Sequence, residues 1–307
     1  MRAAMVVHPA SGLGRAGRIA DTVAERLRGV VDDLVTVAAS TVEESRRLME
    51  RAHDVNLDLL VVVGGDGSAH QGVQFCADTG VALAVVPAGT GNDLARTMGA
   101  PKDPLAATDA LVAAIGAGTP TKIDLGRIAG GSWFAGVLCA GFDSAVNERA
   151  NRMRWPSGPR RYDLAILAEL AKLRSGRLTV VEDAGRAELD ATQIAIGNIP
   201  FYGGGIPVCP DADPTDGLFD ITLIGRASRW DLVKMLPGLR TGNHVDNPVV
   251  TTSRAREVTI SGPDGGPNGW VAYADGERIG PLPLEVSCVP AALTVYGAVE
   301  RFDRHAR

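Results

Sequence analysis

The feature that most constrains the fold is an apolar run that ends abruptly in glycines, Leu59-Leu60-Val61-Val62-Val63-Gly64-Gly65-Asp66-Gly67-Ser68. A near-continuous run of branched apolar residues is typical of a strand buried on both faces of a parallel sheet. The residues that follow, 69–75, predict a helix start. A strand, a glycine turn and a helix start together favour anion binding, because unpaired backbone N–H groups and the helix dipole face the turn. A tight turn without a ligand stays open as the alternative, although a carboxylate at Asp66 is costly there unless it is paired or hydrogen-bonded.

The same pattern recurs through the first third of the chain, where strands alternate with helices. We predict strands over 3–7, 34–38, 59–63 and 81–86, and helices over 19–27, 41–52, 69–75 and 104–117. Such alternation indicates a doubly wound parallel sheet. Glycine turns follow three of these strands, at 8–14, 64–67 and 87–93. They all fall at carboxyl ends of strands, which is the edge where sheets of this kind bind ligands.

The pattern changes after about residue 122, where helices become scarce and short alternating strands dominate. We predict strands over 131–139, 177–182, 193–197, 219–224, 257–261, 270–274 and 284–289, with helices over 162–173 and 229–239. Many short strands separated by turn residues favour an antiparallel β-sandwich. We therefore expect an amino-terminal α/β domain over 1–124 and a carboxyl-terminal β-sandwich over 125–295, with a cleft between them. For the tail, 296–307, a return to the first domain stays open.

Composition narrows the class of protein. The chain has 307 residues, 45% of them hydrophobic, and a net charge of −5, which argues against a nucleic-acid partner. The four cysteines form no C-x-x-C pair, so a reduced cytoplasmic setting fits better than a zinc site or a disulfide framework. We predict no signal peptide and no run of the ~18 apolar residues that a membrane span needs. Strand edges leave a homodimer open.

Several ordered motifs resemble the catalytic domain of diacylglycerol, sphingosine and ceramide kinases, and most closely the soluble bacterial lipid kinases. They are Gly64–Ser68, Gly89-Thr90-Gly91-Asn92-Asp93, Asn198 with Gly203-Gly204-Gly205, Asp216-Gly217-Leu218-Phe219-Asp220, and Asp275-Gly276-Glu277. The resemblance spans nearly the whole chain. It departs in two places: His8-Pro9 stands where the family usually has Asn-Pro, and Ser68 stands where it usually has Thr. The first departure puts the role of the opening turn in doubt, whereas the second keeps a hydroxyl.

The resemblance implies transfer of the γ-phosphoryl group of ATP to a lipid hydroxyl, with Mg²⁺. The first domain would hold the nucleotide, and the second would contact the lipid and close the cleft. Our first choice of acceptor is diacylglycerol, which would yield phosphatidic acid. A sphingoid base, a ceramide or an undecaprenol-like alcohol is the nearest alternative. An NAD kinase and a nucleotide-binding regulator without turnover are more distant ones.

The nucleotide site is expected on the glycine turns. Gly64, Gly65 and Gly67 would let the backbone approach the triphosphate, while Ser68, Ala69 and His70 offer N–H groups at the helix start. Asp66 would face the metal or phosphate-bound water. Thr90, Asn92 and Asp93 would bind the nucleotide and magnesium-bound water, with helix capping as the alternative. Thr41 is placed near the nucleotide by the resemblance, and an ordinary N-cap is equally open.

For the chemistry, the resemblance places the general base in Asp275-Gly276-Glu277. We favour Glu277 as the base, with Asp275 as its rival, and either one could orient the other. By local sequence alone, the triplet is a hairpin turn. The resemblance also implies a magnesium ion held by the carbonyls of Asp213 and Leu218 and the side chain of Asp216. The ion is either catalytic or structural, and in the second case it ties the loop to Asp124 or other acids of the amino-terminal domain. A proline-rich acidic turn without an ion is the alternative.

One basic cluster stands out between residues 149 and 162. It contains five arginines and two aromatic residues, Arg149, Arg152, Arg154, Arg160, Arg161, Trp155 and Tyr162. Anionic leaflets attract such clusters, and tryptophan suits a membrane interface. We predict that this segment docks a cytoplasmic enzyme peripherally on membrane lipid, with a solvated loop as the alternative.

Overall fold

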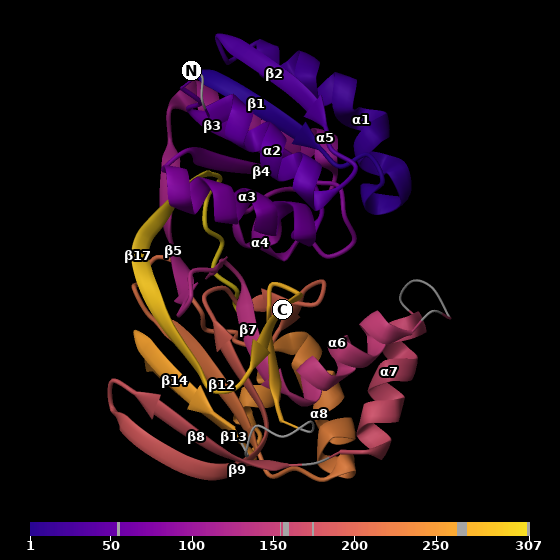
Figure 1. Ribbon diagram of the computed structural model, residues 1–307, viewed down its shortest axis with the longest axis vertical. Helices are drawn as coiled ribbons and strands as arrows, with labels where there is room; N and C mark the ends of the chain where they lie inside the picture. The colour runs from indigo at the N-terminus through magenta and orange to yellow at the C-terminus, as the bar shows by residue number, and fades with distance from the viewer. Residues whose placement is uncertain (54–55, 154, 156–159, 174, 263–268, 306–307) are drawn as a thin grey trace.

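The computed structural model describes residues 1–53, 56–153, 155, 160–173, 175–262 and 269–305 of the 307-residue chain. Figure 1 shows two domains stacked along the long axis of the molecule, with the amino-terminal domain at the top. The predicted fold class, a parallel α/β domain followed by an antiparallel β-sandwich, is confirmed. No helix in the described ranges has the length and apolar character that would let it cross a bilayer.

The amino-terminal domain is a four-stranded parallel sheet in the order β4-β3-β1-β2. Its strands are β1 (Arg2–Val7), β2 (Asp33–Ala38), β3 (Leu59–Gly64) and β4 (Ala82–Pro87). Helices α1 (Ser11–Arg28) and α5 (Pro104–Ala117) pack on one face, and α2 (Val42–His53) and α3 (Asp66–Thr79) on the other. Every residue of β3 is buried, as its unbroken apolar sequence predicts for a central strand covered on both sides.

The second domain is built from antiparallel strands that wrap around one core. They are β5 (Pro120–Ile128), β6 (Trp133–Phe134), β7 (Val137–Gly141), β8 (Gly176–Glu182), β9 (Gly185–Gly197), β12 (Phe219–Gly225), β13 (Val250–Ala255), β14 (Glu257–Ser261), β15 (Val271–Ala274), β16 (Glu277–Pro281) and β17 (Leu284–Tyr296). Phe134 and Phe219 stack at 5.5 Å between ring centroids near the centre of this core. A separate ribbon pairs β10 (Phe201–Tyr202) with β11 (Ile206–Pro207).

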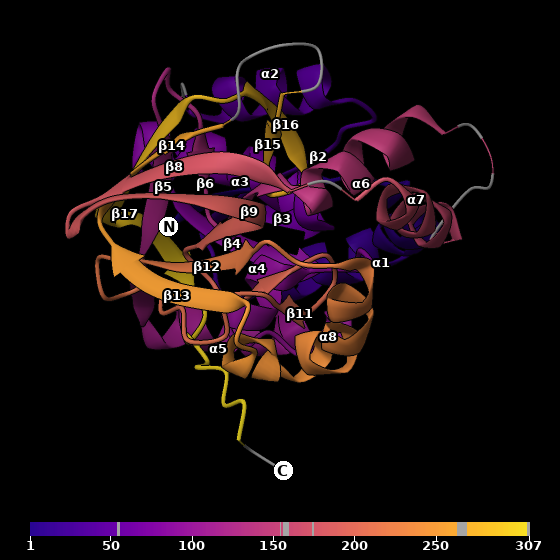
Figure 2. The same ribbon diagram turned by 90° about the horizontal axis from the view of Figure 1, so that it is seen from below.

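Three helices and one 3₁₀ turn complete the domain: α6 (Phe142–Arg152), α7 (Arg160–Ala171), α8 (Arg229–Thr241) and η1 (Asn243–Asp246). Seen from below in Figure 2, α6 and α7 project sideways from the sheet, and α8 lies beside the ribbon β10–β11. Helix α6 was not predicted, and the strand expected over 131–139 is instead two short strands. Gly141, with a φ of 109°, ends β7 and turns the chain into α6, whose Val146 and Ala150 are buried.

Strands β5 and β17 join the two domains. They pair with each other along most of their length, and Val295 of β17 then reaches Leu83 at the edge of β4. Beyond β17, the Glu300 N–H donates to the Thr97 carbonyl of α4 (Asp93–Thr97). Side by side in Figure 1, β5 and β17 form a two-stranded connection between the domains.

Candidate active site

Asp66 joins two of the glycine turns. It is the first residue of α3, directly beyond β3, and its carboxylate accepts two backbone N–H groups of the next turn. Asn92 N lies 2.8 Å from Oδ2, and Asp93 N lies 2.7 Å from Oδ1. Charge-assisted bonds of this kind are among the stronger hydrogen bonds in proteins. Asp66 therefore acts here as a brace between the turns, and both of its oxygens are already engaged.

Glycines make that brace geometrically possible. The turns approach so closely that a Cβ on Gly89 would lie 2.4 Å from the Cα of Gly65, and a Cβ on Gly91 would lie 2.2 Å from Asp66 Oδ2. Both distances are too short for any side chain. The glycines at these positions are thus required by backbone packing between neighbouring turns.

The other residues of the two turns differ in exposure to solvent. Gly67 and Thr90 are exposed, whereas Ser68 and Ala69 are buried at the start of α3. Asn92 has a left-handed backbone at the N-cap of α4, but its side chain makes no cap bond. It closes its own turn instead, since Oδ1 accepts from Gly89 N and Nδ2 donates to Gly89 O.

Thr41 is exposed, and its Oγ1 accepts the Glu44 N–H at 3.1 Å. This is the local N-cap geometry that the sequence left open, at the start of α2. The described contacts of Thr41 are confined to that cap, so its closeness to a nucleotide stays a prediction.

The opening turn lies against the second one. Gly12, Leu13 and Gly14 are consecutive left-handed residues within α1, and a Cβ on Gly12 would lie 1.9 Å from Ala88 O. The sequence predicted a glycine turn here without its conformation. His8 is half-buried, and both of its ring nitrogens lack a hydrogen-bond partner among the described residues.

Asp93 reaches across the gap between domains. Its Oδ2 accepts the Gly204 N–H at 2.9 Å, while its buried Oδ1 has no partner within the described part of the chain. Burial raises the pKa of Asp93 to about 6, and the charge of Asp66 adds to the rise. Asp93 therefore keeps one free acceptor oxygen inside the site.

Arg96 was missed by the sequence reasoning. One turn after Asp93 on α4, it packs on the loop that follows Asn198: its guanidinium carbon lies 5.4 Å from the centroid of the Phe201 ring, and a Cβ on Gly205 would lie 1.7 Å from its Nη1. Spacing was the available signal, because residues three apart on a helix share a face.

His70 and Asp275 form a second bridge between the domains. His70 Nδ1 lies 3.1 Å from Asp275 Oδ2, and both side chains are largely buried. Asp275 also accepts backbone N–H groups from Ala135, at 3.0 Å, and Gly136, at 2.8 Å. Burial lowers the pKa of His70, but the hydrogen bond and charge of Asp275, with the charge of Glu277, raise it above the ordinary value overall. The side chain of His70 thus has a role that the sequence did not predict.

Unlike Asp275, the Glu277 side chain is exposed to solvent and is not held by hydrogen bonds within the described part of the chain. Glu277 begins β16, two residues after Asp275. Asp275 and Gly276 both have positive φ, as a tight hairpin turn requires. Because three donors hold Asp275 while Glu277 stays accessible, the hairpin presents one anchored and one available carboxylate near α3.

The loop expected to hold magnesium is closed by other contacts. Asp213 pairs with Arg301 at 2.6 Å and accepts from Thr215, while Asp216 pairs with Arg254 and accepts from Leu218 N. Asp124 binds the loop directly, since its Oδ2 accepts the Gly217 N–H at 2.7 Å. Among the described residues, no group of three or more His, Cys, Asp or Glu side chains could hold a metal. Both oxygens of the Asp216 carboxylate are therefore engaged, and the ion predicted at this side chain and the carbonyls of Asp213 and Leu218 stays a prediction.

The basic segment is only partly described. Arg154 lies outside the described residues, as do the side chains of Arg160, Arg161 and Tyr162. Arg149 pairs with Glu169, and Arg152 pairs with Glu148 at 2.5 Å. Trp155 is 80% exposed.

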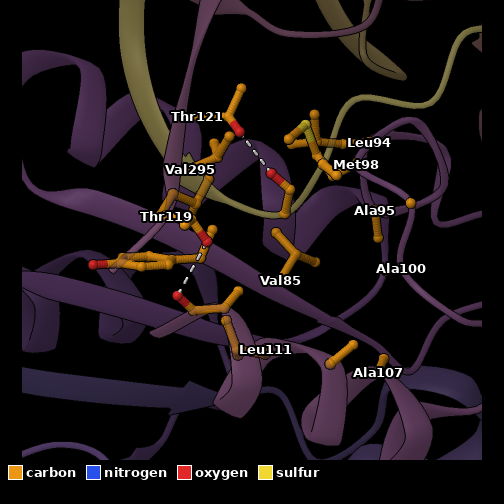
Figure 3. A pocket seen from close by; sticks show the side chains of 17 residues that line it. Val85, Leu94, Ala95, Met98, Ala100, Ala107, Leu111, Thr119, Thr121 and Val295 are labelled. Atoms are coloured by element: carbon orange, nitrogen blue, oxygen red, sulfur yellow. Dashed lines mark hydrogen bonds between the residues drawn. The ribbon is translucent and has the colours of Figure 1, made fainter. Parts of the chain in front are cut away.

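A cavity of about 350 Å³ lies behind α4, between α5, β4 and β17. Figure 3 shows Leu94, Ala95 and Met98 on one side of it and Leu111 with Ala107 on another. Leu83 and Val295, the residue pair through which β4 meets β17, are among its lining residues. None of the described residues that line it is charged, so it does not suit a triphosphate.

Comparisons with known proteins identify the family of the chain. Residues 2–128 match the family model of the diacylglycerol kinase catalytic domain, and residues 136–297 match that of the YegS C-terminal NAD kinase beta sandwich-like domain. A diacylglycerol kinase from Mycobacterium tuberculosis is 42% identical over 297 residues, covering 94% of this chain and 93% of the relative. One from Staphylococcus epidermidis is 25% identical, covering 85% and 82%.

Solved structures show the same fold. Two crystal structures from Bacillus anthracis superpose with TM-scores of 0.79 and 0.73, at 19% and 17% identity. The first match covers 96% of this chain and 95% of that one, and the second, of a diacylglycerol kinase, covers 96% of each.

Proposed function

Since the chain belongs to the diacylglycerol kinase catalytic-domain family and is a lipid kinase, we propose that it transfers the γ-phosphoryl group of ATP to the hydroxyl of diacylglycerol. The observation that carries the proposal is the His70–Asp275 bond, which brings the hairpin of Glu277 to the helix that starts at the glycine turns. Phosphoryl transfer depends mainly on positioning and charge stabilisation, and such a bridge supplies positioning.

The turns supply the nucleotide end of the reaction. Backbone N–H groups at Gly67 and Ser68 are at the start of α3, where the helix dipole favours phosphate oxygens. Asp66 holds the neighbouring turn in register through its two hydrogen bonds. Thr90 is exposed to solvent, so its side chain is free to contact the nucleotide.

The Mg²⁺ that accompanies ATP has one suitable protein ligand here. Asp93 Oδ1 is buried and unpartnered among the described residues, so it has a free lone pair for a hard cation or its water. When bound, the ion would neutralise charge on the β- and γ-phosphate oxygens. This support concerns Asp93 alone and does not extend to the loop of Asp216.

The acceptor end depends on Glu277. Its exposed carboxylate takes the proton of the lipid hydroxyl as the hydroxyl oxygen forms a bond to the γ-phosphorus. The bond between that phosphorus and the β–γ bridging oxygen breaks, so ADP leaves and the lipid becomes a phosphate ester. Asp275 holds the hairpin and His70 in place and does not exchange the proton.

An acceptor panel tests the proposal. Wild type and Glu277→Ala are assayed for ATP consumption with diacylglycerol, a sphingoid base, a ceramide and an undecaprenol-like alcohol in detergent, and with NAD. We expect wild-type turnover with diacylglycerol and none with NAD, and loss of that turnover in Glu277→Ala. Turnover confined to another lipid alcohol, or to NAD, would refute the proposed acceptor, and no turnover with any acceptor would favour the regulator.

A further inference from the structure

Exposed apolar side chains gather on one part of the second domain. Among the described residues, the exposed large apolar side chains outside this part are only Leu13, Val35 and Val181. The rest lie beside α6 and on α7 and α8: Trp155, Leu164, Ile166, Leu167, Trp230, Val233 and Leu236. Exposed apolar side chains that gather on one part of a folded protein mark an interaction site.

The exposed face of α8 is regular. Trp230, Val233 and Leu236 follow one another at intervals of three, so they lie along one side of the helix. Trp230 is 74% exposed and Leu236 is 50% exposed. Met235 lies on the opposite side, where it is buried against Ile224 and Ala227. The helix therefore packs on the domain through a separate face and presents these three side chains to the outside.

Helix α7 continues this surface. Leu164 and Leu167 are exposed at the same interval of three, while Ala165 is fully buried against α6. The Arg229 guanidinium at the start of α8 donates to the Ala171 carbonyl at the end of α7, which joins the two helices. Figure 2 shows the two helices on the same side of the molecule. We call Leu164, Leu167, Trp230, Val233 and Leu236 together the α7–α8 face.

The charges of α8 have on balance the opposite sign to the protein as a whole, while those of α7 cancel, with Arg160 and Arg161 against Asp163 and Glu169. The chain carries a net charge of −5, but α8 has three basic residues, Arg229, Lys234 and Arg240, against one acidic residue. That acidic residue, Asp231, is used in the capping box with Ser228. Apolar side chains rimmed by basic ones are the pattern of surfaces that sit on anionic lipid headgroups.

We propose that the α7–α8 face docks the enzyme on a bilayer surface that contains anionic lipid. The proposal deepens the proposed function, which supplies only the reason for the enzyme to visit a membrane. Tryptophan is suited to this occupant because its ring sits at the level of the headgroups. A second copy of the chain fits less well, since a two-fold contact through this face would place two α8 helices of the same net positive charge against each other.

The test is binding of the full chain to vesicles that contain no diacylglycerol, measured by co-sedimentation. Vesicles of phosphatidylcholine alone are compared with vesicles that also contain phosphatidylglycerol. We expect wild type to bind the mixed vesicles more tightly than the neutral ones. Trp230→Ala should weaken binding to both about ten-fold or more. Arg240→Ala should weaken binding only to the anionic vesicles, about five-fold.

Val181→Thr is the matched control, because Val181 is an exposed valine on β8, away from this face. It should bind as wild type does. Binding of Trp230→Ala and Leu236→Ala at wild-type strength would overturn the proposal. So would a wild-type dimer that Trp230→Ala converts to a monomer, since the face would then be a contact between copies.

Kinase assays in detergent separate this proposal from the proposed function. Diacylglycerol in micelles does not require docking on a bilayer, so Trp230→Ala should keep wild-type turnover there, which also shows that the variant is folded. Vesicle binding by a wild type that phosphorylates no lipid would uphold docking and refute the kinase reaction. Loss of turnover in micelles by Trp230→Ala and Leu236→Ala, with wild-type vesicle binding, would overturn docking.

Discussion

Two conservative substitutions in one hairpin separate the base from the residue that positions it. Glu277→Gln and Asp275→Asn each remove one negative charge and keep the shape of the side chain. Asp275 accepts three hydrogen bonds, from Ala135 N, Gly136 N and His70 Nδ1, at 3.0, 2.8 and 3.1 Å. An asparagine there has one acceptor oxygen, and its amide group would face an N–H donor.

The expected magnitudes differ. Loss of hydrogen bonds to a charged and largely buried group costs about 1.5–3 kcal/mol each, so Asp275→Asn should lower the free energy of unfolding by roughly 2–5 kcal/mol. Glu277 is exposed, and its substitution should change that free energy by less than about 0.5 kcal/mol. Removal of a general base lowers kcat by about 10²–10⁴-fold, which we expect for Glu277→Gln with little change in KM for ATP.

Urea unfolding and initial rates on the same protein samples measure both quantities. Asp275→Asn should be less stable than wild type and should have a higher KM for the lipid, because the hairpin shifts. The double variant measures whether the effects of the two substitutions on kcat and on stability are additive. The reasoning is refuted if Glu277→Gln keeps more than a tenth of wild-type kcat. It is equally refuted if Asp275→Asn unfolds as wild type does and loses turnover, because Asp275 would then be the base.

Three further variants test other parts of the site and the fold. Asp66→Asn loses one of its two charge-assisted hydrogen bonds, which contributes about 1.5–3 kcal/mol. The Kd for ATP in equilibrium binding should rise at least ten-fold. A Kd equal to that of wild type would show that the bonds of Asp66 are not needed for nucleotide binding. Asp124→Ala leaves the N–H groups of Gly217 and Ala291 without their acceptor and should lower the free energy of unfolding by roughly 2–5 kcal/mol, measured in urea; a loss under 1 kcal/mol would contradict this. Burial raises the pKa of Asp143 to about 6, so the native state binds an extra proton between about pH 4 and 6 and its free energy of unfolding falls as pH rises through that window. Asp143→Asn should remove this fall and be more stable than wild type at pH 7.5 by roughly 2–3 kcal/mol, and a difference from wild type that is the same at pH 4 and 7.5 would refute it.

The parallel sheet and its glycine turns could be predicted because each is marked by a short continuous stretch of sequence, an apolar run followed by glycines. A fully buried strand such as β3 has no polar position, and its length and branched residues separate it from a helix. The turn that follows this strand requires glycine for backbone packing, so the glycines in the sequence mark where the turn lies. The N-cap at Thr41 was likewise the prediction that local sequence made, beside the nucleotide contact that the resemblance implied.

The parts that could not be predicted depend on contacts between distant segments. The bond of His70 to Asp275 spans 205 residues of sequence, and the packing of Arg96 on Phe201 spans another long interval. Helix α6 was missed because it holds only a few buried residues, among them Val146 and Ala150, too few to give a clear helical period. The secondary-structure propensities of residues do not indicate which carboxylate will form an ion pair with an arginine such as Arg254.

The same contacts divide the acidic residues of the motifs into two groups. Asp66, Asp216 and Asp275 have both oxygens engaged, by backbone N–H groups, by Arg254 or by His70. Of the motif acids in the described part of the chain, Glu277 and Asp93 Oδ1 have no hydrogen bond or ion pair, and Asp220 pairs with Arg254 through Oδ2. The motif acids thus serve mostly to hold the glycine turns and the two domains together, through the brace at Asp66 and the bonds of Asp93 to Gly204 and of Asp275 to His70. A site fixed in this way needs few free charges, because aligned reactants rather than added groups lower the barrier to phosphoryl transfer.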